Sequence, residues 1–199
     1  MQPETTVPGL KLGWLAEPAP ARLAPGSVEI TAGAKTDWFI DPGGNAPAIV
    51  NAPALVGPAA GDFLLSARVV VGFGSTFDAG VLLVYDRPGV WAKLCFERSP
   101  DGEPMVVSVV TNRLSDDCNS FVVDRDHVWL RVARIGSAFA FHASQDGSSW
   151  GLVRSFTIPA GAEVRVGFEA QSPTGPGCTA SFTDIAFEAR TLSDIRSGD

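Results

Sequence analysis

One short stretch of the chain places ionisable side chains at alternate positions between apolar ones. Residues 91–97 read Trp-Ala-Lys-Leu-Cys-Phe-Glu. Side chains alternate across a β-strand, so the apolar members should enter a core, while Lys93, Cys95 and Glu97 should share the opposite face. An amine and a carboxylate held on one face can bind a polar ligand or pair with neighbouring charges.

Two further predicted strands repeat this division. Glu169 alternates with the apolar residues that precede it, and His142 points away from the two phenylalanines before it. If these strands share a sheet with the first, we expect Lys93, Glu97, His142 and Glu169 on one polar face, the concave face of a curved sandwich. The alternative is ordinary cross-strand ion pairing, such as Lys93 with Glu169, worth about 0.2–1 kcal/mol a pair.

Two polar loops extend this candidate site. Residues 111–120 carry carboxylates, amides and hydroxyls, and residues 170–178 form a stiff connection with two glycines and two prolines. Loops on a rigid sheet often carry function, although an Asx turn or a helix cap explains part of the first loop. Sugar sites combine an aromatic ring with amide and carboxylate groups. The candidate ligand-binding residues are Trp38, Trp91, Lys93, Glu97, Asp116, Asp117, Asn119, His142, Glu169 and Gln171.

Other chemistries find less support in the sequence. A glycosidase needs two carboxyls, which Glu97 with Glu169 or Asp117 could supply, but nothing in the sequence fixes their separation. Two histidines without zinc spacing predict no metal site, and no Gly-x-Ser-x-Gly elbow, phosphate loop or dinucleotide fingerprint is present. We therefore expect no cofactor.

The elements that must position these residues are short strands between turns. No 3.6-residue apolar pattern persists, and strands are expected at 22–31, 37–39, 61–71, 79–85, 90–97, 105–111, 127–135, 138–144, 151–157, 163–169 and 180–189. So many short strands favour two packed antiparallel sheets in a single domain over residues 1–199, with a core at about residues 12–190. The proline-rich stretch 40–60 is expected to be an ordered loop or an irregular edge strand, and the tail 192–199 to fray.

The composition of the chain limits the classes of partner and the cellular location that we expect. The formal net charge of -7 argues against a nucleic-acid partner, which requires a basic patch. No apolar run approaches the length of a membrane span, and the first ten residues lack a signal-peptide pattern, so a cytoplasmic location is expected. Three cysteines predict reduced thiols, with Cys118 and Cys178 placed where their loops could approach each other.

Several motifs, taken in order, resemble the domain of unknown function 1349 family, whose fungal member is named for regulation of enolase. They are Lys-Thr-Asp-Trp-Phe at 35–39, the 91–97 strand, Val-Ser-Val-Val-Thr at 107–111 with Ser-Asp-Asp at 115–117, the Ser-Gln-Asp-Gly-Ser-Ser-Trp turn at 144–150, and Val-Gly-Phe at 166–168 with Gln-Ser-Pro at 171–173. The resemblance implies an all-β, concanavalin A-like jelly-roll sandwich of two curved antiparallel sheets. It implies no reaction, because the Glu-x-Asp-x-x-Glu strand of that superfamily's glucanases is absent.

The sequence therefore predicts a binding module for a carbohydrate or small polar ligand on the concave face. The rival hypothesis is a protein-interaction or metabolic regulatory protein that uses a sheet face or the proline-rich stretch. A concave cleft with convergent polar groups would favour the ligand, and a flat exposed apolar patch would favour the protein partner.

Overall fold

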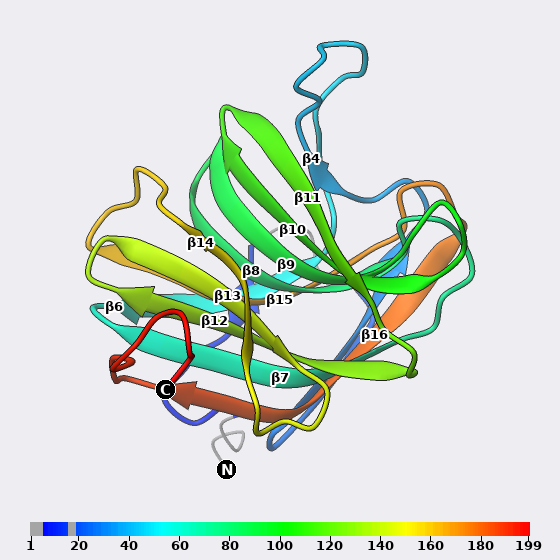
Figure 1. Cartoon of the computed structure of the whole chain (residues 1–199). Coiled ribbons are helices and arrows are strands. Elements are labelled where there is room, and N and C mark those ends of the chain that lie inside the picture. Colours follow the sequence, from blue (N-terminus) through cyan, green and yellow to red (C-terminus); the bar gives the residue numbers. More distant parts are fainter. Residues whose placement is uncertain (1–5, 16–18) are drawn as a thin grey trace.

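Residues 6–15 and 19–199 are described in a computed structural model, which shows two antiparallel sheets packed as a sandwich (Figure 1). The front sheet contains, in spatial order, β1 (Gly13–Trp14), β6 (Ala54–Ala60), β15 (Glu163–Gln171), β8 (Ala79–Arg87), β9 (Val90–Arg98), β10 (Pro104–Asn112) and β11 (Leu114–Val122). The back sheet contains β14 (Gly151–Phe156), β13 (Ala138–Ser144), β12 (His127–Ile135), β7 (Phe63–Val71), β16 (Gly177–Glu188), β3 (Ser27–Gly33) and β2 (Ala21–Ala24). The predicted jelly-roll sandwich is confirmed.

A small third sheet pairs β4 (Trp38–Phe39) with β5 (Ile49–Val50). Figure 1 shows β4 beside the curved strands of the front sheet, on the side away from the back sheet. The described residues form no helix that could cross a bilayer.

Alternation of side chains builds the core between the two sheets. On β9, Leu94 and Phe96 point inward and are fully buried, as the strand parity predicts. Phe168 of the front sheet packs on Phe182 of the back sheet, with ring centroids 4.9 Å apart. Burying a side chain of this size stabilises the fold by about 2–3 kcal/mol. The rigid core thus fixes the outward-facing side chains of the same strands.

Two stretches expected to be irregular are strands of the front sheet. The edge strand β11 covers most of 111–120, and its exposed polar side chains hide the alternation that would have identified it. In β6, Pro58 is tolerated because β1 pairs only with Leu55 and Val56, which leaves β6 without a neighbour on that side at the proline. Sequence reasoning thus missed β11, whereas the edge-strand alternative for residues 40–60 describes the part of β6 beyond its pairing with β1.

Two further expectations need correction. The predicted strand 22–31 is a hairpin of β2 and β3 that turns at Gly26, with a φ of 71°. The tail 192–199 does not fray but packs on the outer face of the back sheet, where Leu192 is buried and Arg131 donates a hydrogen bond to the carbonyl of Gly198 at 2.7 Å. Apolar contacts of the tail supply the anchorage that sequence position alone does not indicate.

Candidate functional site

The outer face of the front sheet carries the polar row that strand parity predicts. Lys93 and Glu97 point away from the core, and the strand register places Lys93, Val109 and Asp117 side by side across β9, β10 and β11. Gln171, at the end of β15, lies on the same face, separated from Glu97 by one residue of β8. Three consecutive strands, β9 to β11, and the distant strand β15 therefore bring these side chains together.

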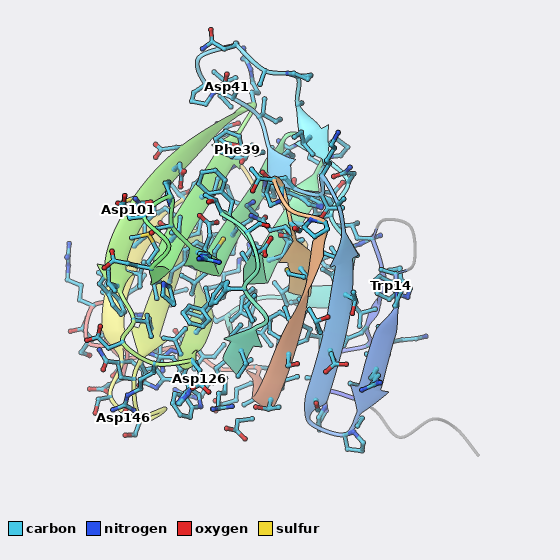
Figure 2. The ribbon with its side chains drawn as sticks, turned by 90° about the vertical axis from the view of Figure 1, so that its right-hand side faces the viewer. Trp14, Phe39, Asp41, Asp101, Asp126 and Asp146 are labelled. Atoms are coloured by element: carbon cyan, nitrogen blue, oxygen red, sulfur yellow. The ribbon has the colours of Figure 1, made fainter. Side chains whose placement is uncertain are left out.

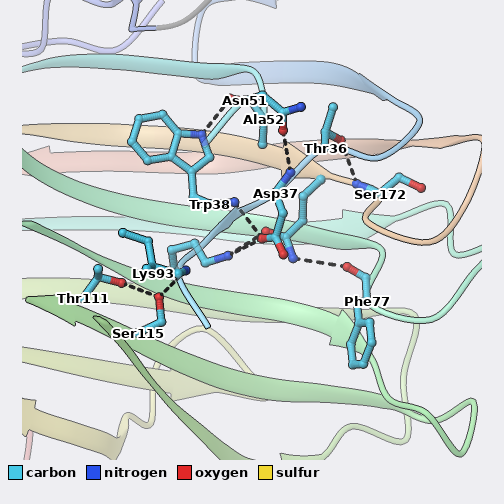
Figure 3. A network of polar contacts seen from close by, with 12 residues as sticks. Thr36, Asp37, Trp38, Asn51, Ala52, Phe77, Lys93, Thr111, Ser115 and Ser172 are labelled. Atoms are coloured by element: carbon cyan, nitrogen blue, oxygen red, sulfur yellow. Dashed lines mark hydrogen bonds and ion pairs between the residues drawn. The ribbon is translucent and has the colours of Figure 1, made fainter. Parts of the chain in front are cut away.

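Residues 35–53, which we call the cover segment, lie over one end of this face (Figure 3). The backbone N–H of Asp37 donates to the side chain of Asn51 at 3.0 Å, and that of Ile40 donates to Ser115 Oγ on β11 at 2.9 Å. Beyond these contacts the loop that holds Asp41 rises off the sheet (Figure 2). The hydrogen bonds fix the position of Asp37 above β9.

Lys93 is the centre of the polar cluster. The residue is 1% exposed, and its amine donates to Asp37 Oδ1 at 2.9 Å and to Gln171 Oε1 at 2.8 Å. Burial alone would lower the pKa of this amine, but the carboxylates of Asp37 and Glu169 hold the pKa well above its ordinary value. The expected direct ion pair with Glu169 is replaced by the pair with Asp37, so Lys93 is a permanent cation that is already engaged.

A cleft opens beside this cluster, with a volume of about 130 Å³. One water needs at least about 10–15 Å³ of such volume, so the cleft can admit several waters or one small molecule in their place. Its lining consists of Asp37, Phe39, Phe77, Lys93, Glu97, Val109, Asp117 and Gln171.

The carboxyls of this face resist ionisation. Burial raises the pKa of Glu97 to about 8, because the neighbouring Lys93 only partly offsets the loss of water. Glu169 is fully buried behind the cleft, both of its oxygens lack a hydrogen-bond partner, and burial raises its pKa to about 7. Burial also raises the pKa of Asp117. At neutral pH, Glu97 is thus a hydrogen-bond donor as well as an acceptor.

Two aromatic side chains that the sequence analysis did not select form walls of the cleft. Phe39 lies two residues beyond Asp37 on the short strand β4, and Phe77 precedes β8. Phe77 has a φ of 68°, a left-handed conformation that is uncommon for a large residue and is often retained at functional sites. The carbonyl of Phe77 accepts a hydrogen bond from Gln171 at 3.2 Å, which ties this strained residue to the polar cluster. Asp37 and Phe39 flank Trp38 and therefore share one side of the strand, so alternation could have indicated Phe39. No sequence signal marks Phe77.

The two tryptophans proposed as ligand platforms are part of the packing beneath the cover segment. The Trp38 ring meets the Trp91 ring edge to face at 5.4 Å, and its indole nitrogen donates to the Ala52 carbonyl at 2.8 Å. Trp38 is 4% exposed and Trp91 is fully buried, so neither ring can stack on a ligand in this structure. Both rings are buried against Ala52 of the cover segment and Ala54 of β6.

Four of the proposed residues line the cleft together: Lys93, Glu97, Asp117 and Gln171. Asp116 lies on the opposite side of β11, where its carboxylate pairs with Arg154 at 3.0 Å. Asn119 is on the same face as Asp117 but further along the edge strand, and it is exposed. Strand alternation therefore divides the polar run of β11 between two faces.

His142 does not belong to this site, contrary to expectation. It lies on β13 of the back sheet, fully buried, and its Nε2 donates to the Ile195 carbonyl of the tail at 2.8 Å. A sandwich has two outer faces, and parity alone does not decide which of them a polar residue occupies. His142 therefore has a structural role beneath the tail.

The cysteines are free thiols. Cys118 is exposed on β11, whereas Cys178 is buried on β16 and donates to the Gln171 carbonyl at 3.1 Å. Cys118 lies on β11 of the front sheet and Cys178 near the start of β16 in the back sheet, so the expected approach of these thiols is not supported by their positions. Burial raises the pKa of Cys178 to about 12, which makes its thiol unreactive.

Solved structures with the same fold include both a chain of similar size and larger enzymes. A functionally unknown protein from Saccharomyces cerevisiae is 26% identical, with a TM-score of 0.83, and the match covers 91% of this chain and 97% of that one. A xylan beta-1,4-xylosidase from Bacillus halodurans is 12% identical, with a TM-score of 0.69, and the match covers 88% of this chain but 36% of that enzyme. The likeness to the xylosidase shows the fold alone.

Bacteroides ovatus xyloglucan PUL GH43B gives a similar result, with 17% identity, a TM-score of 0.69, and coverage of 96% of this chain and 40% of the other. No curated protein matches the chain. The family described as "Protein of unknown function (DUF1349)" matches residues 14–190, and the chain therefore belongs to that family.

Proposed function

We propose that this protein is a binding module that takes a small polar ligand, of about the size of one sugar ring, in the cleft of the front sheet. The observation that carries the proposal is the cleft itself, where hydrogen-bonding groups already held in place converge between two aromatic walls. Ligand sites of this kind combine apolar walls with a few fixed polar groups.

Preorganisation supports the proposal. Lys93, Asp37 and Gln171 hold one another by hydrogen bonds of 2.8 and 2.9 Å, so their rotamers are set before any ligand arrives. A site that is already ordered loses little conformational entropy on binding. Phe77, at 37% exposure, offers an accessible ring on which an apolar sugar face can pack.

A carbohydrate is the ligand class we favour. The sandwich occurs within a protein named as a xylosidase, although this chain matches only about a third of its length. Sugars present both hydroxyls, for groups such as Glu97, Asp117 and Gln171, and an apolar ring face for an aromatic wall. The rival role as a protein-interaction surface has less support, because the large exposed apolar side chains lie in separate places on β2, β5 and β11 and before β8.

Calorimetric titration of the protein with a panel of monosaccharides and short glycans tests the proposal. Saturable binding should weaken at least tenfold in Phe77→Ala and in Glu97→Gln. Asp116→Asn is the matched control, because this carboxylate lies on the opposite side of β11 and outside the cleft lining. Absence of binding to every sugar, or binding unchanged by both cleft variants, would reject the proposal.

Glycoside hydrolysis is a second candidate, favoured by one observation. Glu97, an acid with a raised pKa, lines the same cleft as a second carboxyl, that of Asp117, and glycosidases use such a pair. An aryl-glycoside panel distinguishes the two functions. Hydrolysis that Glu97→Gln abolishes would establish an enzyme, whereas turnover equal in both proteins would exclude Glu97 as the acid.

A further inference from the structure

The acidic side chains around the cleft outnumber the basic ones. Three carboxyls, those of Asp37, Glu97 and Asp117, line it, and Glu169 lies buried behind it. Among the described residues of the lining, Lys93 is the only cation, and its amine is already bonded to Asp37 and Gln171. Once Lys93 and Asp37 neutralise each other, the remaining carboxyls have no counter-charge within the cleft.

Glu97 is the clearest example of a carboxyl without a partner in the cleft. Its side chain lines the cleft although the residue is only 9% exposed, and the hydrogen bonds and ion pairs of the described residues include no partner for its carboxyl. Glu169 repeats the pattern at 0% exposure, with both oxygens unpartnered. Buried polar groups in folded proteins normally have partners, so an unpartnered carboxyl facing a cleft indicates a place for a ligand atom.

The missing partner has a definite chemistry. An anionic ligand would find no free cation in the lining of the cleft, because the Lys93 amine is already bonded to Asp37 and Gln171. The described residues contain no group of three or more His, Cys, Asp or Glu side chains that could hold a metal ion. The aromatic walls, Phe39 and Phe77, present ring surfaces that attract an organic cation.

We propose that the cleft binds a small organic cation, a protonated amine on a body no larger than about one sugar ring, whose charge pairs with Glu97 and Asp117. An amino sugar is one source of this chemistry, and a simple amino alcohol is another. The inference deepens the proposed binding function and rests on it, because it names the ligand class of the same cleft.

Binding of the amine should be linked to release of a proton. The charged and titratable groups that face Glu97 are Lys93 and Cys95 on β9, Asp117 on β11, Glu169 on β15 and Asp37 on the cover segment; β8 and β10 contribute apolar side chains. Because burial raises the pKa of Glu97 to about 8, the free protein carries a proton there that a cation must displace. For an amine that stays protonated, affinity should increase about tenfold or more between pH values of roughly 6 and 8.

Calorimetry near neutral pH with glucose, N-acetylglucosamine, glucosamine and ethanolamine tests the inference. Glucosamine differs from glucose at one position, and N-acetylation removes its charge, so the three sugars isolate the amine. Glucosamine should bind at least tenfold more tightly than either neutral sugar. Ethanolamine binding would identify the amine alone as sufficient, and its failure beside tight glucosamine binding would assign the sugar ring a role.

Variants then locate the charge pairing. Glu97→Gln and Asp117→Asn should each remove most of the preference for glucosamine, while Asp116→Asn should retain it. Repeating the titration in two buffers of different ionisation enthalpy should show proton release by the unmodified protein and less by Glu97→Gln. These readouts separate loss of the amine site from loss of the fold.

Failure of the charge inference and failure of the proposed binding function would give different results. Neutral sugars that bind as tightly as glucosamine, with dependence on Phe77, would overturn the charge inference and leave the proposed function intact. Displacement of the amine by calcium or magnesium ions would assign the site to a metal and overturn the inference. Absence of binding by all four compounds and by the wider glycan panel would overturn both.

Discussion

At the scale of single residues, the front face buries more acids than its one lysine can neutralise. Lys93 pairs with Asp37, whereas Glu97 and Glu169 are buried without an ion-pair partner among the described residues. An uncompensated charge away from water is destabilising, so these two acids fit the fold better when they hold a proton. The same property makes them responsive to a cationic ligand, and it has a consequence for stability that can be measured without one.

The free energy of unfolding should decrease as pH rises. The ordinary pKa of Glu97 is 4.5 and burial raises it to about 8, so between these values the folded state holds a proton that the unfolded state has released. The neutral acid contributes its full stabilisation at pH values below the unfolded-state pKa, and this contribution is lost as the pH rises through the folded-state pKa. Glu97→Gln keeps the shape of the side chain and cannot ionise. At high pH its free energy of unfolding should therefore be larger than that of the unmodified protein, by on the order of a few kcal/mol.

Urea denaturation at pH values of about 5 and about 9 measures this difference. Glu103→Gln, at an exposed position before β10, is the control and should behave as the unmodified protein does. Glu169, whose pKa burial raises to about 7, contributes in the same direction, so Glu97→Gln should show a reduced slope rather than none. Equal pH dependence in Glu97→Gln and the unmodified protein would contradict the assignment.

At the scale of elements, strand parity predicted much of the site. The alternation in 91–97 placed Lys93 and Glu97 on the outer face correctly, and the same rule placed Glu169 there. Parity failed for His142, because it assigns a side of a strand and says nothing about which sheet the strand joins. It also failed for β11, an edge strand whose polar residues match a loop as well as they match a strand.

The rest of the cleft depends on contacts that local sequence does not contain. Asp37 reaches Lys93 only because the cover segment crosses the front sheet, a contact between residues 56 positions apart. Phe77 faces the cleft through an uncommon backbone conformation before β8. Trp38 and Trp91 have the residue type expected of a sugar platform, but the same crossing that brings Asp37 into the site buries both rings.

The close pairing of β6 with β15 makes a prediction at this scale. A methyl group on Gly167 would lie 2.2 Å from the Leu55 carbonyl oxygen and 2.8 Å from Val56 Cα, both backbone atoms of β6. Backbone cannot move aside without opening the ladder that joins the two strands. Gly167→Ala should therefore destabilise the fold by about 3 kcal/mol.

Gly13→Ala in β1 of the same sheet is the matched control, because no atom lies within 4 Å of its added methyl group. Its effect should stay within about 0.5 kcal/mol. Thermal denaturation of both variants gives the comparison, and similar melting temperatures would show that β6 and β15 can separate without loss of stability.

At the scale of the whole molecule, the two outer faces of the sandwich are covered by different segments of the chain. The front face carries the cleft beneath the cover segment. The back face is closed by the tail, where Leu192 and Ile195 pack on β7, β12 and β13. The core separates these two faces, so changes beneath the tail should alter stability without reaching the cleft.

Leu192→Ala tests this separation. The residue is 4% exposed and packs against Leu64, Ala133 and Ala140, so its truncation should destabilise the fold by about 2 kcal/mol and lower the melting temperature by roughly 5 °C. Leu23→Ala, at 50% exposure on the edge strand β2, makes the same chemical change and should have almost no effect. Affinity for a cleft ligand should be the same in both variants. A weakened ligand affinity in Leu192→Ala alone would show that the tail and the cleft are coupled through the core, which the rigid packing between the two sheets argues against.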